Sequence, residues 1–343
     1  MGLLSFNRAV NIYIQGQATA VYLLSILGMR KFIKRTLIFL FTLIGAIILF
    51  YLGISLIERK YSNFKLKNTP KYIIVGHSHS ECAYNDSLLP GCKNLSQSGE
   101  AYFYTYFKIK QVIKQNPSVK VLFIEFANNQ ISQRMDSWIW ANNYMSNNYP
   151  RYFSFMNGSD NLLLARKNPA MYFNSLSWAM KNSLYRIFHE KMDFTSQIGG
   201  YTRLDRNLKD SLLNLNTQTA ASYNIISETN LHYLDAIIDF CKKNGVEPIL
   251  IRSPLHERYG GYENEKLYNQ VIEKRYSKIP YLDFSKFPIP DSAFGDFEHL
   301  NYKGARVYST WFEELLRDGI LDVHPGTSIE HAKEKNFSRI ALF

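Results

Sequence analysis

Cysteine is scarce in this sequence. Among 343 residues there are three cysteines, Cys82, Cys92 and Cys241, and none has metal-ligand spacing. Three are too few for a disulfide-based scaffold. Cys82 and Cys92 are close enough in sequence to pair in an oxidising compartment, whereas Cys241 lies on the apolar face of an expected helix. A small disulfide-rich domain is therefore excluded.

Acidic residues are outnumbered by basic ones. Lysine and arginine total 40 against 29 aspartates and glutamates, which gives a net charge of +11 and a pI near 9.3. This balance suits an anionic partner such as a membrane surface or an acidic polysaccharide, although a solvated basic surface would give it too. Because no basic cluster accompanies a known nucleic-acid-binding motif, we expect no nucleic-acid partner.

Charge is also missing from one long stretch. Residues 36–57 are 22 consecutive uncharged residues, enough to cross a bilayer as a helix. No Ala-x-Ala cleavage pattern comes after it, so we expect an uncleaved single-pass anchor. Basic residues flank it on both sides, but an N-terminal anchor usually exports the domain on its C-terminal side. We therefore expect a cytoplasmic segment 1–35 and a periplasmic or otherwise extracytoplasmic domain.

The ends of the chain carry weaker patterns. Residues 1–28 are either an upstream extension from a misplaced start codon or a short membrane-surface helix. Residues 58–71 are polar and basic, which predicts a short stalk between anchor and domain. Residues 321–343 show no strong periodicity and are expected to form a C-terminal tail.

Residues 72–320 alternate between strand and helix patterns. The apolar runs 72–75 and 119–126 flank an amphipathic segment, 99–115. Strand, helix and strand in about fifty residues form a βαβ unit and predict a parallel sheet. Further patterns predict helices at 231–241, 263–276 and 303–317, and strands at 248–251 and 280–284. The fold class is therefore α/β.

The alternation stops over about 132–226. This stretch mixes aromatic residues with asparagine and serine. An insertion of that length is typical of a binding lid or a partner surface. Aromatic side chains among amides would suit stacking on sugar rings. The competing interpretation is that most of them form the core of a small helical subdomain.

Candidate catalytic residues come directly after the first strand, in Gly76-His77-Ser78-His79-Ser80. The ends of parallel strands are where α/β sheets place their chemistry. Ser78 is the first candidate nucleophile and Ser80 the second. A serine nucleophile needs a histidine base oriented by a carboxylate, and Asp296 and His299, three residues apart, supply that pair.

A metal site is the competing interpretation of the same stretch. Metal-dependent amidohydrolases also present two histidine ligands at a strand end, as His77 and His79 would. Such a site needs further ligands, and the remaining candidates, His256 and His299, are not in a supporting pattern. We therefore expect neither a metal nor another cofactor.

Four segments in order resemble the sequence blocks of the SGNH (GDSL-type) hydrolases. Gly76-His77-Ser78 is similar to the first block, with His77 in place of the usual aspartate. Residues 94–99 are similar to the glycine block, and 124–129 to the asparagine block. Residues 296–301, Asp-x-x-His-Leu-Asn, are similar to the last block of the membrane-anchored subgroup that includes DltD-like and alginate O-acetylation proteins.

The resemblance implies a fold and a site. It implies a three-layer α/β/α, flavodoxin-like domain over residues 72–320 with a Ser78–His299–Asp296 triad. It also implies an oxyanion hole built from the backbone N–H groups of Ser78 and Gly99 and the amide of Asn129. Asn128 is the alternative to Asn129, because 126–129 departs from the usual Gly-x-Asn-Asp.

The implied function is O-acylation, most simply O-acetylation, of a cell-envelope or exported polysaccharide. The partners would be an acyl-bearing donor, a glycan acceptor and a polytopic, MBOAT-like membrane acyltransferase. Two alternatives stay open. One is a carbohydrate or lipid esterase with the same triad, and the other is a non-catalytic accessory protein with an SGNH fold.

Overall fold

The computed structural model describes residues 2–208 and 224–319. The expected C-terminal tail, 321–343, and part of the predicted insertion, 209–223, lie outside the described residues. The chain divides into two units, Met1–Leu56 and Ile57–Phe343.

Helix α1 (Gly2–Tyr61) makes up the first unit, and its last turn belongs to the second. Its portion Gly28–Tyr61 is long and apolar enough to cross a membrane. It contains the predicted segment 36–57, which is therefore a candidate membrane span.

A five-stranded parallel sheet organises the second unit. The strands are β1 (Tyr72–Val75), β2 (Cys92–Asn94), β3 (Val121–Glu125), β4 (Glu247–Arg252) and β5 (Tyr281–Asp283). Their spatial order is β2-β1-β3-β4-β5, and every neighbouring pair is parallel. All of β3 is buried, as expected for a parallel strand covered on both faces. The α/β class is confirmed, and the strand order is that of flavodoxin-like sheets.

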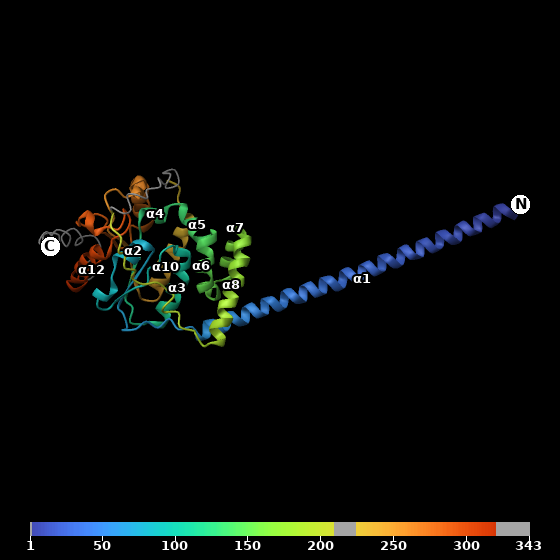
Figure 1. Ribbon diagram of the computed structural model, residues 1–343, viewed down its shortest axis with the longest axis horizontal. Helices are drawn as coiled ribbons and strands as arrows, with labels where there is room; N and C mark the ends of the chain where they lie inside the picture. Colours follow the sequence, from blue (N-terminus) through green and yellow to red (C-terminus); the bar gives the residue numbers. More distant parts are fainter. Residues whose placement is uncertain (1, 209–223, 320–343) are drawn as a thin grey trace. The chain divides into compact units, whose positions relative to one another are not determined.

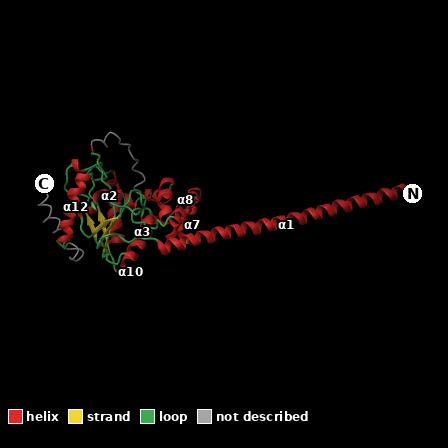
Figure 2. Ribbon diagram, turned by 60° about the horizontal axis from the view of Figure 1, so that its bottom comes forward, coloured by secondary structure: helices red, strands yellow, loops and turns green. Residues whose placement is uncertain are grey.

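Helices cover both faces of this sheet. Helices α2 (Ser78–Ala83) and α12 (Tyr302–Arg317) pack together on one face. Their apolar residues, including Phe312 of α12, share one core with alternate residues of the strands, including Phe123 and Ile249. Helices α3 (Tyr102–Gln115) and α10 (Glu228–Lys243) pack side by side on the other (Figure 2). The domain thus has three layers.

The predicted insertion is mainly helical where it is described. After α4 (Asn128–Ile131) come α5 (Arg134–Trp140), α6 (Asn142–Tyr152), α7 (Gly158–Lys167) and α8 (Pro169–Phe188). These helices pack on one another and on α3 (Figure 1). Buried aromatic residues of this segment include Tyr149 and Tyr152 of α6 and Phe153 and Phe155 of the 3-10 turn after it. Phe173, Trp178, Tyr185 and Phe188 are exposed, so the subdomain-core interpretation accounts for only part of the aromatic residues in 132–226.

Residues 58–71 do not form the free stalk that their basic composition suggested. Phe64 and Leu66 are buried, and the Phe64 ring stacks on Phe194 with centroids 4.9 Å apart. Glu58 forms a buried ion pair with Arg186 at 2.6 Å. Apolar residues alternate here with exposed lysines, so one side of the segment packs on the domain while the charges face solvent.

The structure also differs from the sequence predictions in several local details. Strand β2 was not predicted, and the expected helix at 263–276 is α11 (Glu265–Val271) followed by a π-helical turn, Ile272–Tyr276. Cys82, Cys92 and Cys241 are buried free thiols, so Cys82 and Cys92 form no disulfide.

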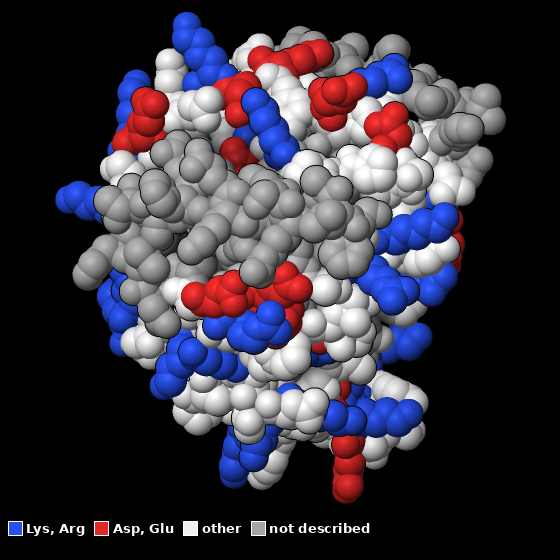
Figure 3. All heavy atoms as spheres, turned by 90° about the vertical axis from the view of Figure 1, so that its left-hand side faces the viewer, with Lys and Arg blue, Asp and Glu red and all other residues white. Residues whose placement is uncertain are grey.

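The surface charge is mixed. On the face drawn in Figure 3, lysine and arginine side chains are interspersed with aspartate and glutamate side chains. The excess of basic residues therefore does not form one continuous basic field on that face.

Candidate active site

Ser78 lies at the turn between β1 and α2. His77 is the N-cap of α2, and its Nδ1 accepts a hydrogen bond from the His79 backbone N–H at 3.4 Å. A Cβ on Gly76 would lie 2.3 Å from Glu125 Cβ and 2.4 Å from Ser80 Oγ, so only glycine fits between the ends of β1 and β3. This close turn leaves Ser78 half-buried where the strand order reverses.

The loop before α12 presents His299. Asp296 Oδ1 accepts hydrogen bonds from the backbone N–H groups of Glu298, at 2.7 Å, and His299, at 2.8 Å. Asn301 then caps α12 by accepting from two backbone N–H groups of its first turn. The Asp-x-x-His-Leu-Asn pattern is therefore a compact loop that fixes carboxylate and imidazole on one side.

Ser78, His299 and Asp296 meet although the serine and histidine are 221 positions apart. His299 Nε2 lies 2.7 Å from Ser78 Oγ. His299 Nδ1 lies 2.8 Å and 2.9 Å from the two carboxylate oxygens of Asp296. In this geometry the imidazole can take the serine proton while the carboxylate holds the tautomer.

Charged neighbours tune His299. Burial lowers the pKa of His299 below its ordinary value, and the nearby carboxylate of Glu298 opposes that shift. Arg206, which forms an ion pair with Asp296, lowers the pKa further. His299 is therefore neutral at pH 7, the form that can act as a base. Arg206 lies in the predicted insertion, and nothing in the sequence indicated its contact with Asp296.

The two candidate asparagines differ in their contacts. The Asn128 amide donates to Asn264 at 3.0 Å and to Glu265 at 2.7 Å, and its Oδ1 accepts from Arg252. Asn129 lies near His77, and its buried Oδ1 has no hydrogen-bond partner in the described part of the chain. The Asn129 side chain is therefore not bonded into the contacts that hold Asn128, and its place in the oxyanion hole stays a prediction.

The other predicted site residues have different places. Ser80 Oγ donates to the backbone carbonyl of His77 at 3.2 Å and is fully buried, so it stabilises the turn. His77 Nδ1 is 3.5 Å from Ser78 Oγ. Gly99 has φ = +71°, and a Cβ there would lie 2.9 Å from the Tyr144 ring.

An aromatic pair from the insertion flanks this region. Trp138 meets His77 edge-on with centroids 5.5 Å apart and stacks on Tyr144 at 5.4 Å. Both rings are half-buried, and Tyr144 also contacts Gly99. The pair therefore lies beside His77, which precedes Ser78, and beside Gly99, the last residue of the glycine block. Both residues belong to the predicted insertion, and no pattern in the sequence indicated that they lie near Ser78.

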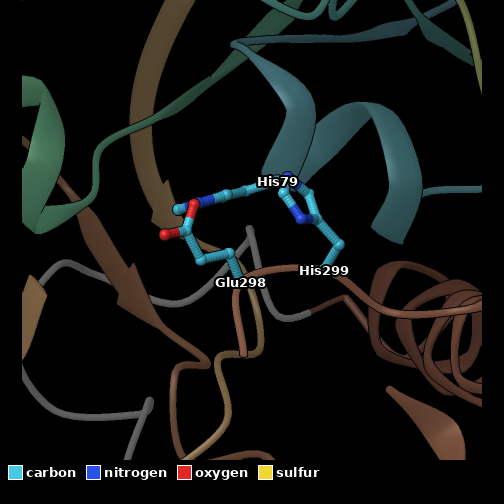
Figure 4. A group of neighbouring side chains, drawn as sticks. All are labelled: His79, Glu298 and His299. Carbon is cyan, nitrogen blue, oxygen red and sulfur yellow. The ribbon is translucent and has the colours of Figure 1, made fainter. Parts of the chain in front are cut away.

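A histidine cluster lies on the other side of His299. His79 Nε2 is 3.6 Å from Glu298 Oε2, and the His79 ring is edge-on to His299 with centroids 5.4 Å apart. Figure 4 shows His79, Glu298 and His299 converging. Burial holds the pKa of His79 well below its usual range, so this imidazole is neutral. His256 lies apart and contacts Asp291 at 3.2 Å, so the cluster differs from the ligand set weighed for an amidohydrolase.

Comparisons with known proteins add little beyond this geometry. A protein-family profile matches residues 206–321. No curated protein sequence matches the chain. Among solved structures, a candidate acylhydrolase from Bacteroides fragilis aligns with a TM-score of 0.34 and 12% identity, covering 78% of this chain and 94% of that one.

Proposed function

We propose that this chain is a membrane-anchored serine acyltransferase of the SGNH type. The observation that carries the proposal is the 2.7 Å approach of His299 Nε2 to Ser78 Oγ, with Asp296 2.8 Å from the other ring nitrogen. A half-buried serine at the end of a central strand, paired with a neutral and oriented imidazole, has the parts needed for nucleophilic acyl transfer.

Each group has a distinct role in the proposed reaction. His299 takes the Ser78 proton while Ser78 Oγ forms a bond to the carbonyl carbon of an ester or thioester. The backbone N–H groups of Ser78 and Gly99 and the Asn129 amide stabilise the oxyanion, and loss of one such donor typically costs about 10²- to 10³-fold in rate. The intermediate collapses as His299 protonates the leaving group. His299 then deprotonates the acceptor hydroxyl as it attacks the acyl-serine carbonyl, and it returns that proton to Ser78 Oγ when the bond between the acyl group and Ser78 breaks.

The aromatic pair favours a sugar as acceptor. Trp138 and Tyr144 are stacked 5.4 Å apart beside His77 and Gly99. Aromatic rings with partly exposed faces suit the apolar faces of pyranose rings. We therefore favour O-acetylation of a cell-envelope or exported polysaccharide over simple hydrolysis. A carbohydrate or lipid esterase would use the same triad with water as acceptor.

The candidate span suggests where the reaction takes place. Helix residues Gly28–Tyr61 would anchor the chain, with the N-terminus in the cytoplasm and the catalytic domain in the periplasm or outside. A polytopic, MBOAT-like acyltransferase in the same membrane would deliver the acyl group. The mechanism needs no cofactor.

Ester turnover by the full chain in detergent tests the triad. With p-nitrophenyl acetate, Ser78→Ala and His299→Ala should each lower kcat by about 10⁴-fold or more. Ser80→Ala is the matched control and should retain activity, because Ser80 only bonds the His77 carbonyl. A wild-type chain without turnover, and without reaction towards a fluorophosphonate, would favour the accessory-protein alternative.

Partitioning between sugar and water tests the acceptor. Vinyl acetate would serve as a ring-free donor and a soluble oligosaccharide as acceptor, with both products counted by mass spectrometry. Trp138→Ala should lower acetyl transfer to sugar relative to hydrolysis, whereas Trp178→Ala, on the exposed face of α8, should not. An unchanged ratio in Trp138→Ala would argue for the esterase.

A further inference from the structure

His79 is a buried imidazole whose ring makes no hydrogen bond within the described part of the chain. Its side chain is 0% exposed, and neither Nδ1 nor Nε2 has a hydrogen-bond partner among the described residues, although Nε2 lies 3.6 Å from Glu298 Oε2. Burying an unsatisfied polar group costs stability, so nearly all such groups have partners. A group left open beside a candidate active site therefore points to a ligand.

The neighbours of His79 are also metal-binding side chains. One ligand atom from each of His79, Glu298 and His299 lies within 4.8 Å of the other two (Figure 4). His79 comes from α2, and the other two come from the loop before α12. The Glu298 side chain is 43% exposed and that of His299 14%, so the group opens to solvent on one side.

Asp296 contacts the other ring nitrogen of His299, Nδ1. It lies 2.8 Å from His299 Nδ1, which leaves Nε2 with the lone pair that faces away from the carboxylate. A carboxylate bonded to the far nitrogen is the usual outer partner of a metal-bound histidine, because it fixes the tautomer and raises the basicity of the ligand. The contact that prepares His299 as a base therefore also prepares it as a ligand.

We infer that His79, Glu298 and His299 form a Zn²⁺ site that competes with the serine chemistry. Two histidines and a glutamate are an established zinc donor set that leaves a fourth position open. Ligand atoms on a tetrahedral zinc ion are about 3.4 Å apart. The His79 to Glu298 separation of 3.6 Å is close to that value, and the exposed Glu298 side chain can adjust.

The inhibitory effect rests on the proposed function. While Zn²⁺ holds His299 Nε2, that nitrogen cannot accept the proton of Ser78, whose Oγ lies 2.7 Å away. His299 Nε2 therefore cannot bind Zn²⁺ and act as the base in acyl transfer at the same time. The ion acts as a reversible inhibitor and takes no part in the reaction.

Metal binding is measured first, without reference to activity. The full chain in detergent, treated with a chelator, is titrated with Co²⁺, whose visible absorption reports tetrahedral nitrogen and oxygen ligands, and Zn²⁺ then displaces it. His79→Gln and Glu298→Gln should each weaken binding by about tenfold or more. Glu298→Gln guards against misfolding, since that side chain is largely exposed. His256→Gln, at a buried histidine outside the cluster, is the matched control.

Inhibition is measured second, as the rate at which a fluorophosphonate labels Ser78. Zn²⁺ should slow labelling, a chelator should restore it, and in His79→Gln the inhibitory concentration should rise by about tenfold or more. No Co²⁺ site, or equal affinity in His79→Gln, would overturn the metal site and leave the serine mechanism intact. A chelator that abolishes activity would overturn both the inhibitory role and the serine mechanism.

Discussion

Two polar clusters lie at the carboxyl ends of strands of the same parallel sheet, and they differ in how many of their polar atoms have hydrogen-bond partners. In one, Arg252 donates from Nη1 and Nη2 to the two oxygens of Glu265, at 2.9 Å and 2.7 Å, and Nη2 also contacts Asn128, while Nε alone of its three nitrogens lacks a hydrogen-bond partner among the described residues. In the other, both nitrogens of the buried His79 lack a hydrogen-bond partner among the described residues.

The difference indicates that the Arg252 cluster stabilises the fold, whereas the His79 nitrogens are available for chemistry. The Arg252 network holds Asn128 in place, and the next residue, Asn129, lies near His77. A polar network with its main groups satisfied rigidifies a structure, whereas open groups cost stability and are expected at functional sites. Changes in the first cluster should therefore affect unfolding, and changes in the second should affect chemistry.

The largest effect is expected from Asp296→Asn. The amide cannot hold the His299 tautomer needed for proton transfer, so kcat for ester cleavage should fall by about 10⁴-fold with the fold intact. Asp283→Asn, in the Arg252 cluster, is the matched change and should leave kcat within a few-fold of wild type. Comparable losses of kcat in the two variants would contradict the distinction between a structural cluster around Arg252 and a catalytic one around His299.

Arg252→Met should have the largest effect on stability. It leaves Asn128 and Glu265 without their cationic partner, and breaking a buried pair typically costs about 3–5 kcal/mol. Because Glu265 is 38% exposed, we expect about 3 kcal/mol, the low end of that range. Denaturant unfolding of the detergent-solubilised chain would measure it. A change below about 1 kcal/mol, the size of an ordinary surface pair, would contradict the structural role.

His79→Leu should have the opposite sign. It removes two buried nitrogens that lack hydrogen-bond partners among the described residues and introduces an apolar side chain of similar size, so the free energy of unfolding should rise by about 1 kcal/mol. The same unfolding assay applies. A loss as large as that of Arg252→Met would show that His79 is needed for folding.

The smallest effect is a change in the pH dependence of stability. Burial depresses the pKa of His77 and His79 below the ordinary 6.5, so under acid conditions the unfolded chain takes up protons that the folded chain does not. Their contribution to stability is therefore lost as pH falls below about 6.5. Glu125, whose pKa burial raises to about 7, acts in the opposite direction.

The difference between wild type and His79→Leu isolates the histidine contribution from that of Glu125. Between about pH 7.5 and pH 5.5, the melting temperature of His79→Leu should fall less than that of wild type. Parallel curves for the two proteins would mean that His79 titrates normally in the folded chain.

The sequence predicted the α/β class and the residues that meet at the site, because both depend on local patterns at strand ends. Ser78, Asp296 and His299 lie in short turns whose spacing is visible in the sequence, and their catalytic role stays a prediction. The contacts of Arg206 and Trp138 with the site were not predictable, since they depend on how the insertion packs. The stalk prediction was wrong because composition hid the alternation that buries Phe64 and Leu66.

Fluorophosphonate labelling of the full chain, with the modified residue identified by peptide mass spectrometry, tests the central claim most directly. We predict a single adduct on Ser78 in the wild type, and labelling slowed by several orders of magnitude in His299→Ala. An adduct on another residue, or equal labelling in His299→Ala, would contradict a serine nucleophile activated by His299.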